Sequence, residues 1–162
     1  MLLQTATVAV MEAVEAQAMQ VAQAQMAADT HHRDLRNAMD LKTARVFVRD
    51  LDAAKQFYSR KLGLQLTADG SQYGYCVFKA GSTELVVEVV ADDAPEEDST
   101  LVGRFTGLSF TVQNIEEKHR HLVALGVPFT GAPVKQFWGG ILATLQDPSG
   151  NELQIVERPT AA

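Results

Sequence analysis

The sequence predicts an α+β fold in which two tandem βαβββ modules follow a helical N-terminal extension. Two observations indicate the modules: Leu62-Gly63-Leu64 recurs 63 positions later as Leu125-Gly126-Val127, and Asp50 has a counterpart 64 positions later in Asn114. A third indicates the extension, since the first 40 residues contain no Gly or Pro. We therefore assign residues 1–40 to the extension and 41–162 to a globular body, whose parts are the modules at about 41–91 and 104–158 and an acidic linker at 92–103.

The extension is rich in Ala, Gln and Met, which favour helix. Small and apolar side chains recur every three or four residues between Val8 and Gln25, which gives a thin stripe. Such a stripe does not stabilise an isolated helix in water, so we expect it to dock on the body or on a partner subunit; a frayed extension is the alternative. Thr30 is expected to cap a second short helix whose histidines, His31 and His32, lie on a solvated face.

Each module shows the same order of signals. The first has a strand at 44–48, a helix at 52–62 that Asp50 caps and Gly63 ends, and further strands at 64–67, 75–79 and 84–90, with a turn at 69–70. The second has strands at 107–112, 140–146 and 152–157, and a helix at 116–125 that begins after Asn114. A turn at 147–150 joins the last two strands.

Composition excludes several classes of function. The net charge of −6 argues against a nucleic-acid partner, because binding a polyphosphate requires a basic face. The single cysteine, Cys76, excludes an intrachain disulfide and is expected in the core. No apolar run approaches the roughly 20 residues of a membrane span, and the N-terminus lacks the pattern of a signal peptide. We expect no membrane partner and a cytoplasmic protein.

The strand around Glu88 has two different faces. Alternation places apolar side chains on one face and puts two acids among valines on the other, which suits a cavity wall better than a core. The same alternation turns Arg45 and Phe47 toward this cavity, and Ser109 and Gln154 from the second module. Arg45 is placed to pair with Glu88; a buried ion pair with no ligand is the structural alternative.

Two segments resemble a known family. The segment 48–64, VRDLDAAKQFYSRKLGL, resembles the first-module signature of the vicinal oxygen chelate superfamily, which contains glyoxalase I, bleomycin-resistance proteins, fosfomycin-resistance proteins and extradiol dioxygenases. The segment 145–155, LQDPSGNELQI, resembles its closing turn and last strand. The resemblance covers about 42–158. It implies that the strands curl into an open barrel around one cavity, and it implies a homodimer. The N-terminal helix lies outside the resemblance, and we expect it to add a contact to this dimer.

The resemblance also implies four metal-ligand positions, which fall on Thr43, Glu88, Gly107 and Gln154. One carboxylate and one amide are too few donors for a tight divalent site. Residues 42–118 contain no histidine, and the histidines at 119 and 121 lie on the second predicted helix, facing away from the barrel. We therefore expect no metal cofactor.

Phe137 and Trp138 stand before two glycines, in a loop that leads into a strand. An aromatic pair at this position is suited to lie over the cavity mouth and to stack on a flat or cationic ligand. The alternative is that Trp138 covers the core or a dimer interface.

Two functional hypotheses follow. The first is metal-free binding of a small, partly aromatic or cationic organic molecule, as bleomycin-resistance proteins do, by Arg45, Phe47, Glu88, Ser109, Phe137, Trp138 and Gln154. The second is an enzyme: either a divalent-metal lyase, isomerase or dioxygenase, or a metal-free catalyst in which Glu88 is the base.

Overall fold

The computed structural model describes residues 17, 19–26 and 39–159 of the chain. The chain divides into two compact units, Met1–Asp40 and Leu41–Ala162. In the first unit, residues 19–26 are helical and their side chains are exposed. Most of the predicted stripe and the predicted short helix with His31 and His32 lie outside the described residues. No described helix has the length and hydropathy that crossing a bilayer requires.

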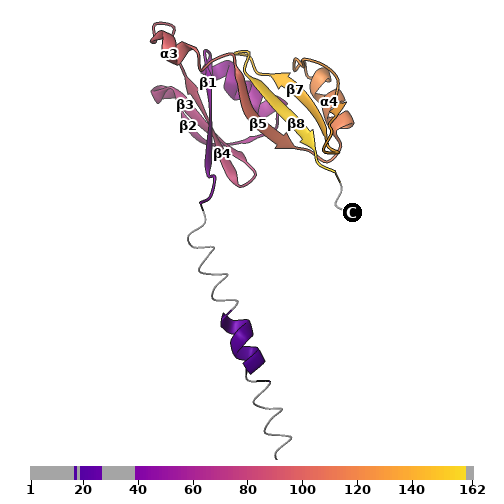
Figure 1. Cartoon of the computed structure of the whole chain (residues 1–162). Helices are drawn as coiled ribbons and strands as arrows, with labels where there is room; N and C mark the ends of the chain where they lie inside the picture. Colours follow the sequence, from indigo (N-terminus) through magenta and orange to yellow (C-terminus); the bar gives the residue numbers. More distant parts are fainter. Residues whose placement is uncertain (1–16, 18, 27–38, 160–162) are drawn as a thin grey trace, which may run out of the picture. The chain divides into compact units, whose positions relative to one another are not determined.

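The second unit contains two four-stranded sheets with the same strand order. Figure 1 labels β1 to β4 of the first sheet and β5, β7 and β8 of the second. The order is β1-β4-β3-β2 in the first sheet and β5-β8-β7-β6 in the second. In each sheet the first two strands of this order, β1 and β4 or β5 and β8, pair in parallel, and the other pairs are antiparallel. The first sheet comprises β1 (Thr43–Val48), β2 (Gln65–Gly70), β3 (Tyr75–Ala80) and β4 (Thr83–Val89). The second comprises β5 (Phe105–Thr111), β6 (Val134–Lys135), β7 (Ile141–Gln146) and β8 (Glu152–Glu157).

The helices begin where the sequence predicts. Asp50 accepts a hydrogen bond from the backbone N–H of Ala53 at 2.9 Å, and Asn114 accepts one from Glu117 at 3.0 Å, so both are N-caps. The helical segments are α2 (Leu51–Gln56), η1 (Phe57–Lys61), η2 (Ser71–Tyr73), α3 (Glu96–Ser99) and α4 (Ile115–Ala124). The predicted α+β fold of two βαβββ modules is therefore confirmed, and the two sheets are not closed, as in an open curved barrel.

Two local predictions were wrong. The first helix is not α-helical to Leu62, because its last turn widens into a π-helix in which the N–H of Leu62 donates to the carbonyl of Phe57 at 3.0 Å. Asp69 and Gly70 are not a turn but the end of β2, paired with Cys76 and Tyr75. The chain turns at η2 instead, where the Asp69 carboxylate accepts from the backbone N–H of Ser71 at 3.1 Å.

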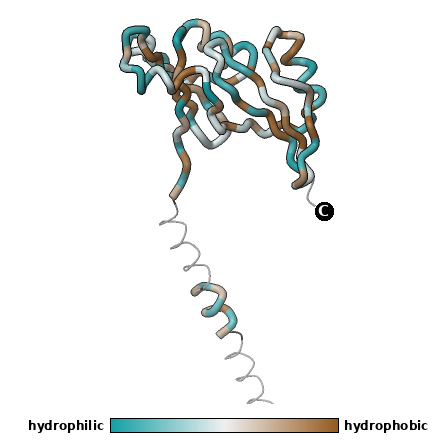
Figure 2. The backbone as a smooth tube through the Cα atoms, turned by 45° about the horizontal axis from the view of Figure 1, so that its top comes forward, coloured by the Kyte–Doolittle hydropathy of each residue, from teal (hydrophilic) through white to brown (hydrophobic). Residues whose placement is uncertain are grey.

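One hydrophobic core joins the two modules. Its buried side chains come from the helices and from one face of each sheet: Val46, Val48, Phe57, Tyr58, Cys76, Phe78, Leu85, Val87, Ile115, Leu122, Leu145, Leu153 and Ile155. In Figure 2 the strands are brown over much of their length and the outer loops are largely teal. Cys76 lies in this core as predicted, and burial raises the pKa of its thiol to about 11.

The turn between β7 and β8 connects the second module to the first. Its Asp147 is buried and accepts a hydrogen bond from the Tyr58 hydroxyl at 2.9 Å. The fully buried Asn151 donates to the carbonyl of Phe47 at 2.8 Å and accepts from the N–H of Gly103 at 2.8 Å. Burial, and then the Asp147 carboxylate, hold the pKa of Tyr58 far above its usual value, so Tyr58 remains a donor.

Candidate ligand-binding site

Each sheet has an open face, which is the face turned away from the core. On the first sheet this face carries the predicted residues Arg45, Phe47 and Glu88, from β1 and β4. Arg45 and Glu88 form an ion pair in which the guanidinium Nη1 donates to Glu88 Oε2. The two side chains are 57% and 35% exposed, so the pair is not the buried ion pair of the structural alternative. Solvent screening limits its contribution to stability to about 1 kcal/mol or less.

The register of β1 on β4 sets which acids and which β1 residues are neighbours. Thr43 lies opposite Glu84, whereas Glu88 lies opposite Phe47. The carboxylate beside Thr43 is therefore that of Glu84, and Glu88 lies four register positions further along the strands. Gly107, the third position that the resemblance implies, has a positive φ of 74° in the irregular part of β5 and supplies no side-chain donor.

The donor set does not fit a divalent metal of the glyoxalase type. Within 39–159 and the described part of the extension, no three His, Cys, Asp or Glu side chains lie close enough together to hold a metal ion. Of the two histidines of α4, His121 is exposed, whereas His119 is half-buried and packs its ring edge-on against Phe129, with 4.4 Å between the ring centroids.

Tyr75 belongs to the first open face and was missed by the sequence reasoning. It lies opposite Glu88 on β3, and its ring covers Gly70 so closely that a Cβ at Gly70 would be 2.5 Å from the ring. A glycine opposite an aromatic residue on a neighbouring strand is a known way to seat the ring. The signal was present in the sequence, but the wrong turn at Asp69-Gly70 concealed it.

The second open face contains a cavity of about 540 Å³. Ser109 on β5 and Gln154 on β8 are neighbours there, and the Ser109 hydroxyl donates to Gln154 Oε1 at 3.1 Å. The cavity is lined by Ser109, Trp138, Leu142, Val156, Arg158 and Pro159. It contains no residue of the first module, so the structure separates the predicted site residues into two groups, one on each sheet.

Trp138 is the aromatic wall of this cavity. Its ring is 43% exposed and lies directly over Gly140, where a Cβ would come within 1.8 and 2.0 Å of ring atoms. Only glycine at position 140 therefore permits this position of the indole. Phe137 is fully exposed and is not among the lining residues. Of the two aromatic residues that the sequence predicts at the cavity mouth, only Trp138 lines the cavity, and Phe137 faces solvent.

Arg158 also lines this cavity and was missed by the sequence reasoning, because the predicted last strand ends at Glu157; Leu142 and Pro159 were missed as well. Its side chain has no hydrogen bond or ion pair with another described residue. The cavity therefore offers a flat aromatic face, the apolar side chains of Leu142 and Val156, the hydroxyl of Ser109 and one guanidinium. This set can stack, desolvate and hydrogen-bond a small molecule, and it contains no nucleophile paired with a base.

Comparison with known proteins agrees with the fold and the modules. The family model of the Glyoxalase/Bleomycin resistance protein/Dioxygenase superfamily matches residues 40–155. The uncharacterized protein YraH of Bacillus subtilis (strain 168) is 27% identical over 124 residues, which are 72% of this chain and 97% of YraH.

Two solved structures share the fold. The first is a member of the same superfamily from Sphaerobacter thermophilus DSM 20745, with a TM-score of 0.62 and 25% identity over 75% of this chain and 98% of that one. The second is TnmS3, an antibiotic binding protein from Streptomyces sp. CB03234, with a TM-score of 0.61 and 24% identity over 76% of this chain and 98% of that one.

Proposed function

We propose that this chain, which belongs to the glyoxalase/bleomycin resistance protein/dioxygenase superfamily, binds a small, partly aromatic organic molecule beside Trp138 without a metal. One observation carries the proposal: a cavity of about 540 Å³ has a half-exposed indole as its wall. This volume lies within the roughly 300–1,000 Å³ of small-molecule sites in proteins.

The shape of the wall favours a flat ligand. Gly140 permits the indole of Trp138 to lie against the start of β7, where a flat ligand can stack on its exposed part. An aromatic pair contributes about 0.5–1.5 kcal/mol beyond the burial of its area. Leu142 and Val156 supply apolar surface around the ring.

Charge restricts the ligand further. Arg158 lines the cavity, and its guanidinium repels a cation and attracts an anion. The acid that could attract a cation, Glu88, is on the other sheet and is already paired with Arg45. Between the aromatic and cationic ligands that the sequence leaves open, we therefore propose a neutral or anionic aromatic molecule.

The test is a screen of aromatic acids, phenols and aromatic cations against the whole chain. Trp138 is the only tryptophan, so its fluorescence reports binding directly. For ligands that quench it, calorimetry on Trp138→Ala should show affinity lowered about tenfold, since stacking and the lost apolar contact together amount to roughly 1.5 kcal/mol. Phe137→Ala, which removes the fully exposed neighbouring ring, is the matched control and should bind normally.

Two results would overturn the proposal. One is that no aromatic compound binds, or that Phe137→Ala weakens binding as much as Trp138→Ala. The other is a rise in melting temperature with Zn²⁺, Ni²⁺, Mn²⁺ or Fe²⁺ that is lost on Glu88→Gln, because a ligand specific for the folded state raises its melting temperature. The second result would support the metal-dependent enzyme instead.

We also propose a homodimer in the cytoplasm. The resemblance to the family supports the dimer, and the single cysteine, which is buried and has no disulfide partner, suits a reducing compartment. Sedimentation equilibrium of the full chain at micromolar concentration tests the dimer, and a single monomeric species would contradict it.

A further inference from the structure

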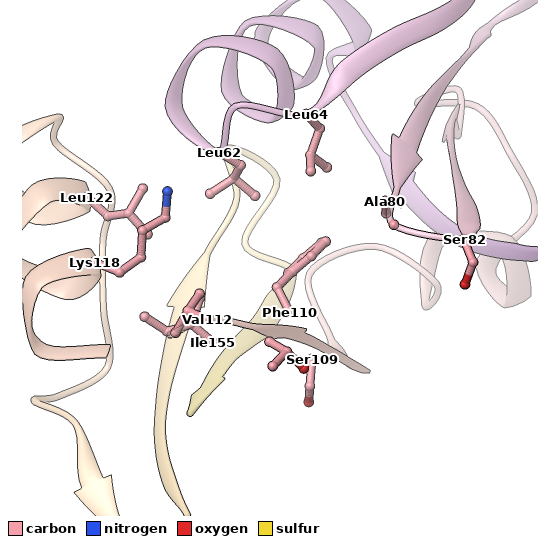
Figure 3. A pocket seen from close by; sticks show the side chains of 12 residues that line it. Leu62, Leu64, Ala80, Ser82, Ser109, Phe110, Val112, Lys118, Leu122 and Ile155 are labelled. Atoms are coloured by element: carbon pink, nitrogen blue, oxygen red, sulfur yellow. The ribbon is translucent and has the colours of Figure 1, made fainter. Parts of the chain in front are cut away.

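A second cavity, of about 500 Å³, lies between the two modules and is lined by residues of both. We call it the inter-module crevice. Figure 3 shows Leu62 and Leu64 of the first module facing Phe110 of β5 and Val112, which follows β5, across it. Its other lining residues are Ala80, Gly81, Ser82, Ser109, Thr111, Lys118, Leu122 and Ile155.

The crevice exposes apolar surface that the core leaves incompletely packed. Leu62, Leu64, Phe110 and Val112 pack against the core but remain only half-buried, whereas Leu122, at the crevice's inner wall, is fully buried. A neighbouring cavity of about 290 Å³ shares Ala80, Ser109 and Phe110 with it and continues toward Ala44 and Leu85. The apolar surface is therefore elongated, and covering it would release water from several large side chains.

Among the residues that the structure describes, Lys118 is the only charged one that lines the crevice. It is half-buried, and its side chain makes no hydrogen bond or ion pair with another described residue. Figure 3 shows its ammonium nitrogen directed toward Leu62. No ion pair joins it to the neighbouring acid Glu117 in the described part of the chain; the Glu117 carboxylate accepts from the Asn114 amide at 3.4 Å. A partly desolvated ammonium beside an apolar surface has an unmet preference for an anion.

We infer that the inter-module crevice binds an amphipathic carboxylate, with the carboxylate on Lys118 and the apolar chain along Leu62, Leu64 and Phe110. The occupant is an elongated aliphatic acid rather than a flat aromatic one, because the walls are aliphatic apart from Phe110 and the cavity continues along β5. The crevice shares Ser109 with the Trp138 cavity but includes neither Trp138 nor Arg158, so variants at Lys118 and at Trp138 distinguish the two sites.

Calorimetry on the full chain with decanoate, decanol and decyltrimethylammonium tests the inference, since the three probes share a chain and differ in head group. Decanoate should bind with the highest affinity. Lys118→Met retains the aliphatic stem and should weaken decanoate binding about fivefold or more, the factor for one partly screened charge-assisted contact, without weakening decanol binding. Lys135→Met, at an exposed lysine on β6, is the matched control and should leave all three affinities unchanged.

Lys118→Glu provides a second, independent outcome, because reversing the charge should reverse the preference from decanoate to decyltrimethylammonium. Both Lys118 variants should melt at the wild-type temperature, since the side chain has no partner to lose. The inference is overturned if decanoate does not bind, if Lys118→Glu keeps the preference, or if Trp138→Ala rather than Lys118→Met removes decanoate binding. The last result would place the acid in the Trp138 cavity.

Discussion

Replacing Asn151 by Ala should destabilise the second unit more than any other single amide truncation in a turn or cap. The side chain is fully buried and makes three hydrogen bonds. Its Nδ2 donates to the carbonyl of Phe47 at 2.8 Å and to Asp147 Oδ2 at 2.9 Å, and its Oδ1 accepts from the N–H of Gly103 at 2.8 Å. Alanine leaves both backbone groups without these partners.

The expected cost follows from the desolvation of those groups. A buried polar group that loses its only partner costs about 1–3 kcal/mol, and the two backbone groups are partly buried, so the free energy of unfolding should fall by roughly 2–5 kcal/mol. For a unit of this size, 1 kcal/mol shifts the melting temperature by about 3–6 °C, so a decrease on the order of 10 °C is expected.

Urea unfolding followed by circular dichroism measures the change. Asn114→Ala is the matched control, because Asn114 is an exposed N-cap whose loss costs about 1 kcal/mol. If Asn151→Ala costs no more than Asn114→Ala, the bonds of Asn151 do not hold the modules together and the reasoning is wrong.

Three further predictions concern titration and packing. Tyr58 keeps its proton in the folded state while the unfolded chain loses it above about pH 10, so the wild type loses stability as pH rises past 10. The free energy of unfolding of Tyr58→Phe, measured with urea, should therefore fall less than that of the wild type between about pH 9 and 11. Equal pH dependence of the two free energies would contradict this. The hydrogen bond from Lys55 lowers the pKa of Asp69 to about 2, so its stabilising effect is present above about pH 4 and is lost as pH falls toward 2. An NMR titration that gives Asp69 a pKa near 4 would refute that contact. Gly140→Ala places a Cβ within 2.0 Å of the Trp138 ring, so the emission should shift to the red and aromatic ligands should bind weakly; an unchanged spectrum would show that the ring does not lie there.

The fold could be predicted because its signals are local. Asp50 and Asn114 cap helices through their own side chains, and the spacing between the modules repeats. The π-helical turn at 57–61 could not be predicted, because helix composition is the same for α and π turns and tertiary packing selects between them. The end of β2 at Gly70 was not predicted for a related reason: the Tyr75 ring from the neighbouring strand covers this glycine, which is a tertiary contact.

The sequence could predict which side chains of the candidate site lie on the open face of each sheet, but not which residues of neighbouring strands lie opposite each other. Alternation identifies the side chains that leave the core, such as Arg45 and Ser109, yet it does not determine which residues of two strands are opposite each other. The pairing of Thr43 with Glu84 emerged only from the structure. Arg158 was missed because it lies beyond the predicted last strand, and Tyr75 was missed because the wrongly predicted turn at Asp69-Gly70 hid its pairing with Gly70.

The most direct test of the proposed function is the fluorescence of Trp138 in the metal-free, full-length chain during titration with aromatic acids, phenols and aromatic cations. We predict saturable quenching by a neutral or anionic aromatic compound, retained in Phe137→Ala and weakened in Arg158→Gln for the anionic compounds only. If no compound quenches the emission, or if quenching requires an added divalent metal, the cavity beside Trp138 is not a metal-free binding site.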